Sequence, residues 1–124
     1  MIKISWEIDN NKPIYIQLLE QVKLKIISGE IPIGSKLDSV RVLAQDAEVN
    51  PNTMQKALSE LEREGLVFSK RTSGRYVTDD KEKIESMRDE MAKIHINSLK
   101  ETLKKLGYGQ GEIIDLIKQN LEEE

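Results

Sequence analysis

The stretch SVRVLAQDAEVNPNTMQKALSELEREGLV, residues 39–67, contains a helix whose two faces differ in chemistry. Asn50 can accept from the free N–H groups of a first helical turn, Pro51 suits the first position of that turn, and Gly65 marks the end of the helix. The apolar residues share one side of a helical wheel: Met54, Ala57, Leu58 and Leu61. The opposite side carries Asn52, Lys56, Ser59 and Arg63. One side is therefore predicted to pack, and the other to face a partner.

A shorter helix is predicted just before this one. Asp38 or Ser39 can cap it, and it extends to about Ala47. Glu48 then lies in the turn between the two helices. If that turn requires a positive φ, glutamate is strained there by on the order of 1 kcal/mol relative to glycine. The substitution Glu48→Gly is then expected to raise the melting temperature.

The flanking segments complete the order of elements. Upstream, Pro13 and Gly29 bound a helix with four apolar residues at helical spacing: Ile14, Leu18, Val22 and Ile26. Downstream, residues 66–71 and 75–78 are typical of two strands around a turn that contains Gly74. Three helices followed by a hairpin is the order of a winged helix-turn-helix. A short strand is also expected near the N-terminus, where apolar residues alternate with polar ones: Ile2, Ile4 and Trp6.

A two-helix tail over residues 79–124 is predicted to follow the winged helix-turn-helix domain of residues 1–78. Asp79-Asp80 can cap a helix that reaches Leu106, a rod of roughly 40 Å at 1.5 Å per residue. A last helix starts at about Glu112, after glycines that break the first. Each helix has an apolar stripe: Ile84, Met87, Met91, Ile94, Leu99, Leu103 and Leu106 on the first, and Ile113, Ile117 and Leu121 on the second. The predicted fold class is α+β, mostly helical.

The tail stripe is too long to be buried against one small domain and one short helix, so a second copy of the chain is its predicted partner. His95 lies on this stripe, either as a packed, hydrogen-bonded interface residue or as a sensor of pH or ligand. Met87 and Met91 could line a pocket for an unidentified small-molecule effector, or they could fill irregular core space. The sequence leaves both alternatives open.

Composition excludes several classes of site. The chain has no cysteine and a single histidine, so disulfides, thiolate metal sites and His-pair metal motifs cannot be built. We find no nucleophile–base pair and no phosphate-cradling glycine loop, so neither an enzyme nor a bound cofactor is expected. No apolar run approaches the ~20 residues that a membrane span needs, and we expect a soluble, cytoplasmic protein without a membrane partner.

The net charge of −3 argues on its own against a partner rich in phosphate. However, residues 1–78 carry 11 basic and 10 acidic groups, a balance of +1, whereas residues 79–124 carry 8 and 12, a balance of −4. Within the first part, residues 68–78 hold Lys70, Arg71 and Arg75 and no acid. The predicted hairpin therefore offers a basic edge to phosphates.

Six ordered motifs strongly resemble the DNA-binding domain of GntR-family repressors. They are PIY (13–15), SGE (28–30), GSKL (34–37), SVRVLA (39–44), VNPNT (49–53) and LEREGL (61–66). The match covers about half of the chain, from Pro13 to Val77. Two departures are visible: Asp38 stands where the family usually has proline, and Glu48 stands where the turn usually has glycine. The resemblance implies a regulator, in most members a repressor, that binds double-stranded operator DNA.

The resemblance also implies which residues meet the DNA. These are Arg41 at the start of the second helix, Asn50, Asn52, Thr53 and Gln55 with Pro51 in the third, and Gly74 at the tip of the wing. Charge and position add Lys56, Arg71 and Arg75. Arg41 near a helix N-terminus is disfavoured by the macrodipole unless a phosphate or base edge receives it.

The short tail, with LKKLG at residues 103–107, is similar to that of the YtrA subfamily, whose two-helix tail mainly dimerises. A twofold dimer would place two recognition helices about 34 Å apart, or a multiple of this, on an inverted repeat. The alternative is a winged-helix module that docks proteins and never touches DNA, and the net acidity favours it. Salt-dependent binding to duplex DNA distinguishes the two.

Overall fold

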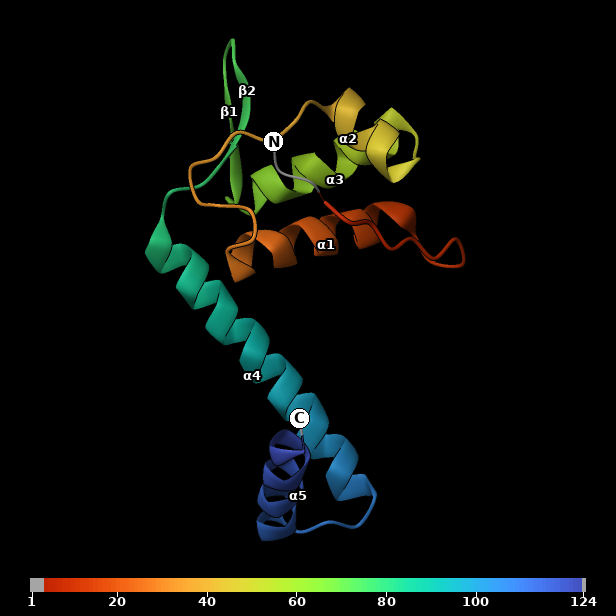
Figure 1. Ribbon diagram of the computed structural model, residues 1–124, viewed down its shortest axis with the longest axis vertical. Coiled ribbons are helices and arrows are strands. Elements are labelled where there is room, and N and C mark those ends of the chain that lie inside the picture. The colour runs from red at the N-terminus through yellow and green to blue at the C-terminus, as the bar shows by residue number, and fades with distance from the viewer. Residues whose placement is uncertain (1–3, 124) are drawn as a thin grey trace. The chain divides into compact units, whose positions relative to one another are not determined.

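A computed structural model describes residues 4–123 and has the predicted order of elements (Figure 1). The elements are α1 (Ile14–Ser28), α2 (Val40–Ala47), α3 (Pro51–Arg63), β1 (Val67–Lys70), β2 (Gly74–Val77), α4 (Lys81–Lys105) and α5 (Gln110–Glu122). The α+β, mostly helical winged helix-turn-helix with a helical tail is thereby confirmed. One compact unit extends to Ser86 and a second begins at Met87. Ile84, in the first turn of α4, is buried at 4% exposure, so the start of α4 belongs to the first compact unit.

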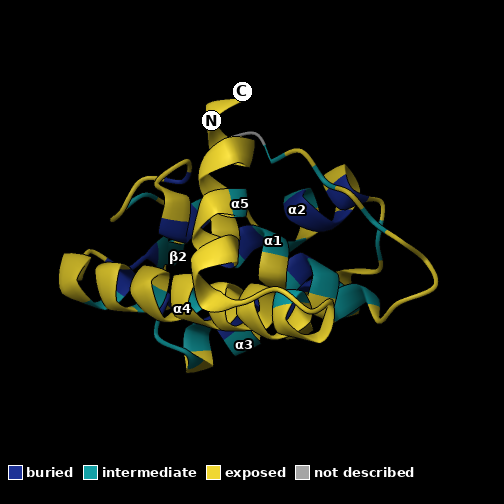
Figure 2. Cartoon of the chain, turned by 90° about the horizontal axis from the view of Figure 1, so that it is seen from below, coloured by how far each residue is buried: buried dark blue, intermediate teal, exposed yellow. Residues whose placement is uncertain are grey.

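The core of the first unit lies mainly between α1 and α3, which run side by side (Figure 1). Figure 2 shows the buried residues of these helices in dark blue. The residues with at most 1% exposure include Leu18, Val22 and Ile26 of α1 and Met54, Leu58 and Leu61 of α3. Both sets come from the predicted apolar faces. Each buried side chain of this size stabilises the fold by about 1.5–3 kcal/mol relative to its exposed state.

The two helix starts that the sequence predicted are capped as expected. Ser39 Oγ accepts from the backbone N–H of Val42 at 3.2 Å. Asn50 Oδ1 accepts from the backbone N–H of Asn52 at 2.8 Å, and Pro51 follows at the first helical position. The turn between the helices places Glu48 at φ 55° and ψ 46°, in the left-handed region. The positive φ proposed for this turn is therefore confirmed.

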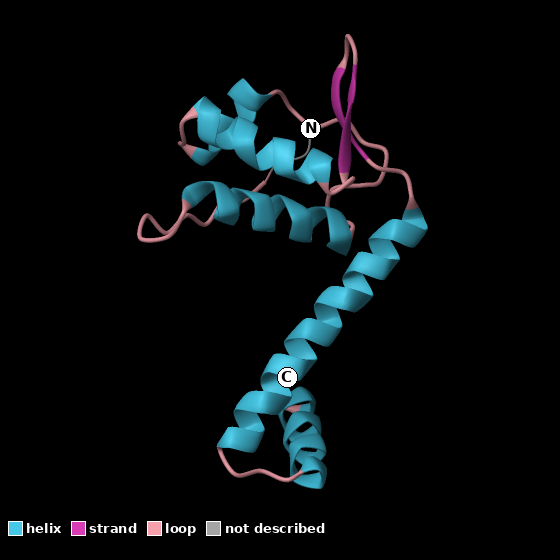
Figure 3. Ribbon diagram, turned by 180° about the vertical axis from the view of Figure 1, so that it is seen from behind, coloured by secondary structure: helices cyan, strands magenta, loops and turns pink. Residues whose placement is uncertain are grey.

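The wing is the antiparallel pair β1–β2, with Val67 opposite Val77 and Ser69 opposite Arg75 (Figure 3). The connector between α1 and α2 lies along the free edge of β2. Leu37 donates its backbone N–H to Arg75 O at 2.9 Å, and Val77 donates to Ser35 O at 2.8 Å. This connector therefore fixes the wing beside the start of α2.

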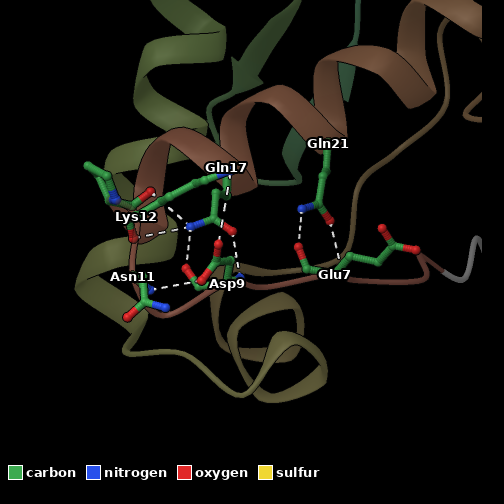
Figure 4. Close-up of polar contacts among 7 residues, drawn as sticks. Glu7, Asp9, Asn11, Lys12, Gln17 and Gln21 are labelled. Carbon is green, nitrogen blue, oxygen red and sulfur yellow. Dashed lines mark hydrogen bonds and ion pairs between the residues drawn. The ribbon is translucent and has the colours of Figure 1, made fainter.

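The N-terminal segment is an arm held by side chains. Of the strand expected at residues 2–6, residues 2 and 3 lie outside the described part of the chain, and the described residues 4–6 form no strand. The arm instead runs along α1 (Figure 4). Gln21 accepts from Glu7 N at 3.0 Å and donates to Glu7 O, and Gln17 does the same for Asp9 at 2.7 Å each. These amides replace a partner strand, because each supplies one donor and one acceptor.

The second unit contains the later part of α4 and α5. Gly107, at φ 99°, ends α4, and Tyr108 donates its backbone N–H to Leu103 O at 3.1 Å. The last helix begins at Gln110, two residues before the predicted start, because Glu112 Oε1 accepts the backbone N–H of Gly109 at 3.0 Å. Gly111, expected to break the helix, lies inside α5. Within residues 4–123, the helices are too short or too polar to cross a membrane.

Candidate nucleic-acid interface

The outward face of α3 presents the predicted polar side chains. Asn50, Pro51, Asn52, Gln55 and Lys56 are exposed, and Thr53 is half-buried. Among the described residues, no hydrogen bond holds the side-chain amide of Asn52. Both its acceptor and its donor are therefore available for the bidentate pairing that asparagine makes with adenine. Asn50 is also exposed, but its Oδ1 already caps the helix, which leaves its side-chain NH₂ group as the donor for a partner.

Neighbouring residues hold two other side chains of α3 in place. Lys56 Nζ lies 3.9 Å from the ring centroid of Tyr15 in α1, a cation–π distance. Gln55 Nε2 donates to Ser59 Oγ at 3.2 Å. Both side chains keep their polar ends at the exposed surface. The contact with Tyr15 joins helices far apart in the sequence, and no local pattern indicated it.

Arg41 is the second residue of α2 and is exposed. In the described part of the chain, no ion pair holds its guanidinium. The positive end of the α2 dipole disfavours a cation at this place. An anion from outside the protein, such as a DNA phosphate, would satisfy both the guanidinium and the free N–H groups of the first turn.

A cleft of about 750 Å³ separates the start of α2 from the wing. Its walls are residues 36–40 and residues 69–75, with Asp38 as the one acidic residue among them. Four cations line it: Lys36, Lys70, Arg71 and Arg75. The positive charge of the wing, including Lys70, was expected from the sequence, but Lys36 was not. Lys36 reaches the cleft through the bridge between its backbone and Tyr76, which no local sequence signal shows.

Arg75 differs from the other wing cations because it is turned toward α3. Its Nε lies 3.3 Å from Glu62 Oε1, and its side chain is 18% exposed. Ser69 Oγ donates to the same carboxylate oxygen at 2.7 Å. Arg71 and Gly74 are exposed near the tip of the wing, where Gly74 has φ 110°. The three wing residues predicted to meet DNA therefore have different environments.

The C-terminal half of α3 carries a surface pair. Arg63 Nε donates to Glu60 Oε2 at 3.0 Å. This hydrogen bond lowers the pKa of Glu60 and raises the pKa of Arg63. Because the two charges offset each other, the end of α3 attracts phosphate less than its beginning does.

The predicted dimerisation residues fall into three groups by exposure. Ile84 and Ile113 are buried inside the single chain, at 4% and 5%. Met87, Met91 and Leu103 are half-buried. The exposed ones are Ile94, Leu99, Leu106, Ile117 and Leu121, from 37% for Ile117 to 68% for Leu106. His95 is also exposed.

An apolar groove of about 510 Å³ lies between the end of α4 and α5. It is lined by Leu99, Leu103, Leu106, Tyr108, Leu116, Ile117, Asn120 and Leu121. Met87 and Met91, suggested by the sequence for an effector pocket, do not line it. The groove is therefore formed by the end of α4, the loop after it and α5.

Comparisons with known proteins agree with this geometry. A family model described as "Bacterial regulatory proteins, gntR family" matches residues 14–77. The chain is 32% identical to the uncharacterized HTH-type transcriptional regulator YhcF of Bacillus subtilis, over 90% of this chain and 93% of that protein. It is 38% identical to the solved structure of a GntR family transcriptional regulator from Listeria monocytogenes, with a TM-score of 0.85 over 90% of this chain and 98% of that chain.

Two relatives carry the name YtrA. The HTH-type transcriptional repressor YtrA of Bacillus subtilis is 42% identical over 57% of this chain and 55% of its own length. The YtrA structure from Sulfolobus acidocaldarius, a GntR-family transcription factor, is 32% identical, with a TM-score of 0.55 over 79% of this chain and 96% of that chain. These relatives are transcription regulators, which are not enzymes. The chain belongs to the GntR family and is a DNA-binding transcriptional regulator.

Proposed function

We propose that the protein represses transcription by binding an inverted-repeat operator as a homodimer. The observation that carries this proposal is the exposed, polar N-terminal half of α3 on a helix whose other face is fully buried. We assign this half to the major groove of the operator. Asn52 and Gln55 would pair with base edges there, and Lys56 would reach guanine or phosphate.

The basic cleft between α2 and the wing is assigned to the phosphate backbone. Arg41 would contact phosphate at the edge of the major groove, while Arg71 and Gly74 would approach the neighbouring minor groove. Lys36 and Lys70 are added to this set because they line the cleft. Contacts of this kind fix the register of the protein on the duplex without reading its sequence. They would also explain how a chain with net charge −3 binds DNA, because four cations are gathered in the cleft that we assign to the duplex.

The tail is assigned to dimerisation. Leu106, Leu121 and Ile94 are each about two-thirds exposed in the single chain. A second copy would cover these residues together with the groove between α4 and α5. Twofold symmetry then places two copies of α3 on half-sites about 34 Å apart, or a multiple of this.

Repression is proposed from the relatives and from geometry. YtrA and NagR of Bacillus subtilis are both named repressors. A dimer seated on an operator that overlaps a promoter would block RNA polymerase by occupying the same DNA. Binding to chromosomal DNA would place the protein in the bacterial cytoplasm.

The test begins with genomic DNA fragments that the protein retains in vitro. Sequencing them should yield an inverted repeat, and gel shifts should then compare the full repeat with a duplex of the same length that keeps one half-site. We expect much tighter binding to the full repeat, since two linked contacts act together. Equal affinity for both duplexes would contradict dimeric recognition, and binding independent of salt would contradict phosphate contact.

A further inference from the structure

We propose that Glu62 is a positioning residue that holds the wing at a fixed angle to the recognition helix. In this proposal Arg75 serves that contact and does not bind phosphate. The inference rests on the proposed function in one respect, namely that the wing meets the DNA. It differs from the expectation that Arg75, as a wing cation, contacts the duplex.

One carboxylate oxygen of Glu62 receives a donor from each strand of the wing. Ser69 Oγ of β1 donates to Oε1 at 2.7 Å, and Arg75 Nε of β2 lies 3.3 Å from the same atom. Ser69 and Arg75 are cross-strand partners, so their side chains lie on the same face of the hairpin. The opposite face carries Phe68 and Tyr76, whose ring centroids are 6.1 Å apart. Glu62 therefore joins α3 to one defined face of the wing.

The burial of Arg75 supports its structural role. Its side chain is 18% exposed, whereas Arg71, the residue directly after β1, is exposed. The backbone of Arg75 is fixed as well, because its carbonyl accepts the N–H of Leu37 at 2.9 Å. Arg75 thus connects the wing to the segment that leads into α2 and, through Glu62, to α3.

This connection matters because a two-stranded hairpin is marginally stable alone. A wing free to tilt would have to be ordered when it meets the minor groove, and that ordering weakens binding. Charge-assisted hydrogen bonds are stronger than neutral ones and keep the wing in place before DNA arrives. Recognition helix and wing can then engage adjacent grooves together.

A direct phosphate contact by Arg75 predicts the opposite effect of removing Glu62. Loss of the carboxylate would then free a cation and reduce repulsion of the duplex, so operator affinity would rise. The positioning role predicts that affinity falls. The sign of the change therefore separates the two roles.

The experiment measures binding of full-length variants to the selected operator duplex by fluorescence anisotropy over a series of salt concentrations. Glu62→Ala removes the acceptor, and Glu62→Gln keeps its shape and oxygen without the charge. Glu60→Ala is the matched control, because it removes the neighbouring carboxylate of α3, which pairs with Arg63 and not with the wing. Circular dichroism melting confirms that each variant is folded.

We expect Glu62→Ala to bind about tenfold more weakly than Glu60→Ala, as for loss of hydrogen bonds to a charged group. Glu62→Gln should fall between them. Arg75→Met should weaken binding by a similar factor, and the double variant Glu62→Ala with Arg75→Met should be no weaker than either single variant. Folded Glu62→Ala that binds as tightly as Glu60→Ala, or independent losses in the double variant, would overturn the proposal.

Hydroxyl-radical footprints separate failure of this inference from failure of the proposed function. Wild-type protein should protect the major-groove half-sites and the nucleotides beside them where the wing lies. Glu62→Ala should lose the second protection and keep the first. Protection by wild type that persists unchanged in Glu62→Ala overturns the positioning role alone. Absence of wing protection in wild type overturns the assignment of the wing to DNA, and the positioning role with it.

Discussion

The two units of this protein differ in how far their apolar helix residues are exposed. In the first unit, Leu18, Met54 and Leu61 are 0% exposed. In the second, Leu106 and Leu121 are 68% and 67% exposed, although they too lie on an apolar helix face. The first unit thus completes its core within one chain, and the outward face of its helix α3 is polar.

This difference indicates two kinds of partner. A closed core with a polar outward helix suits a charged, hydrogen-bonding surface such as duplex DNA. Large exposed aliphatic residues at regular helical positions suit another apolar surface. The acidic balance of the second unit, with 6 basic and 8 acidic groups in residues 87–124, also makes it a poor match for DNA. The predictions that follow test this contrast.

The largest expected effect on operator affinity comes from placing charges on the apolar face of the tail. If the tail dimerises as proposed, the double substitution Leu106→Glu with Leu121→Glu should yield a monomer and weaken operator binding by roughly 10²–10⁴-fold, because the two half-sites would no longer be linked. Sedimentation and gel shift measure the two effects. Thr102→Glu, an exposed polar position of α4, adds negative charge outside the groove and should leave both unchanged. A double variant that stays dimeric would refute this use of the tail.

The next effect concerns the closed core. Leu61→Ala should lower the free energy of unfolding by about 2–5 kcal/mol, since it leaves a cavity between packed helices. Leu24→Ala, on an α1 residue that is 52% exposed, should change it by less than about 0.5 kcal/mol. Urea denaturation provides the comparison. Similar losses of unfolding free energy at the two positions would mean that the first unit does not complete its core within the chain.

A smaller effect, on operator affinity, is expected from Arg41 at the exposed start of α2 in the same unit. Arg41→Ala should weaken operator binding by roughly 1–3 kcal/mol and leave the melting temperature unchanged, because the side chain is exposed. Anisotropy titration and thermal melting measure the two quantities. Folded protein with wild-type affinity would remove Arg41 from the interface.

The smallest expected effect is a gain in thermal stability. Glu48 lies at φ 55°, where a side chain costs on the order of 1 kcal/mol relative to glycine. Glu48→Gly should therefore raise the melting temperature by a few degrees, as about 1 kcal/mol does in a domain of this size. An unchanged or lower midpoint in calorimetry would show that the left-handed conformation carries no penalty here.

The sequence predicted the fold well where the signals are local. Caps at Ser39 and Asn50 and the apolar face of α3 depend on spacing within a few residues, and the structure has each of them. The described part of the expected N-terminal strand, residues 4–6, forms no strand, and the residues that follow it are bound by the side-chain amides of Gln17 and Gln21. Alternation of apolar residues cannot distinguish these two arrangements.

The candidate site was predicted less completely because it depends on distant contacts. Charge alone placed Arg75 with the wing cations, but Glu62 lies 13 residues away and turns it toward α3. Lys36 reached the cleft only through pairing of the connector with β2. In the tail, spacing could not show that Ile84 and Ile113 are buried within the chain while Leu106 is not.

The most direct measurement compares the base preferences of wild-type protein and Asn52→Ala, by selection from a library of duplexes around the operator. The variant should fold and still bind, and its preference should relax at one symmetry-related pair of base positions, with about 1–3 kcal/mol of discrimination lost at each. An unchanged preference at every position would contradict the assignment of the exposed face of α3 to base reading.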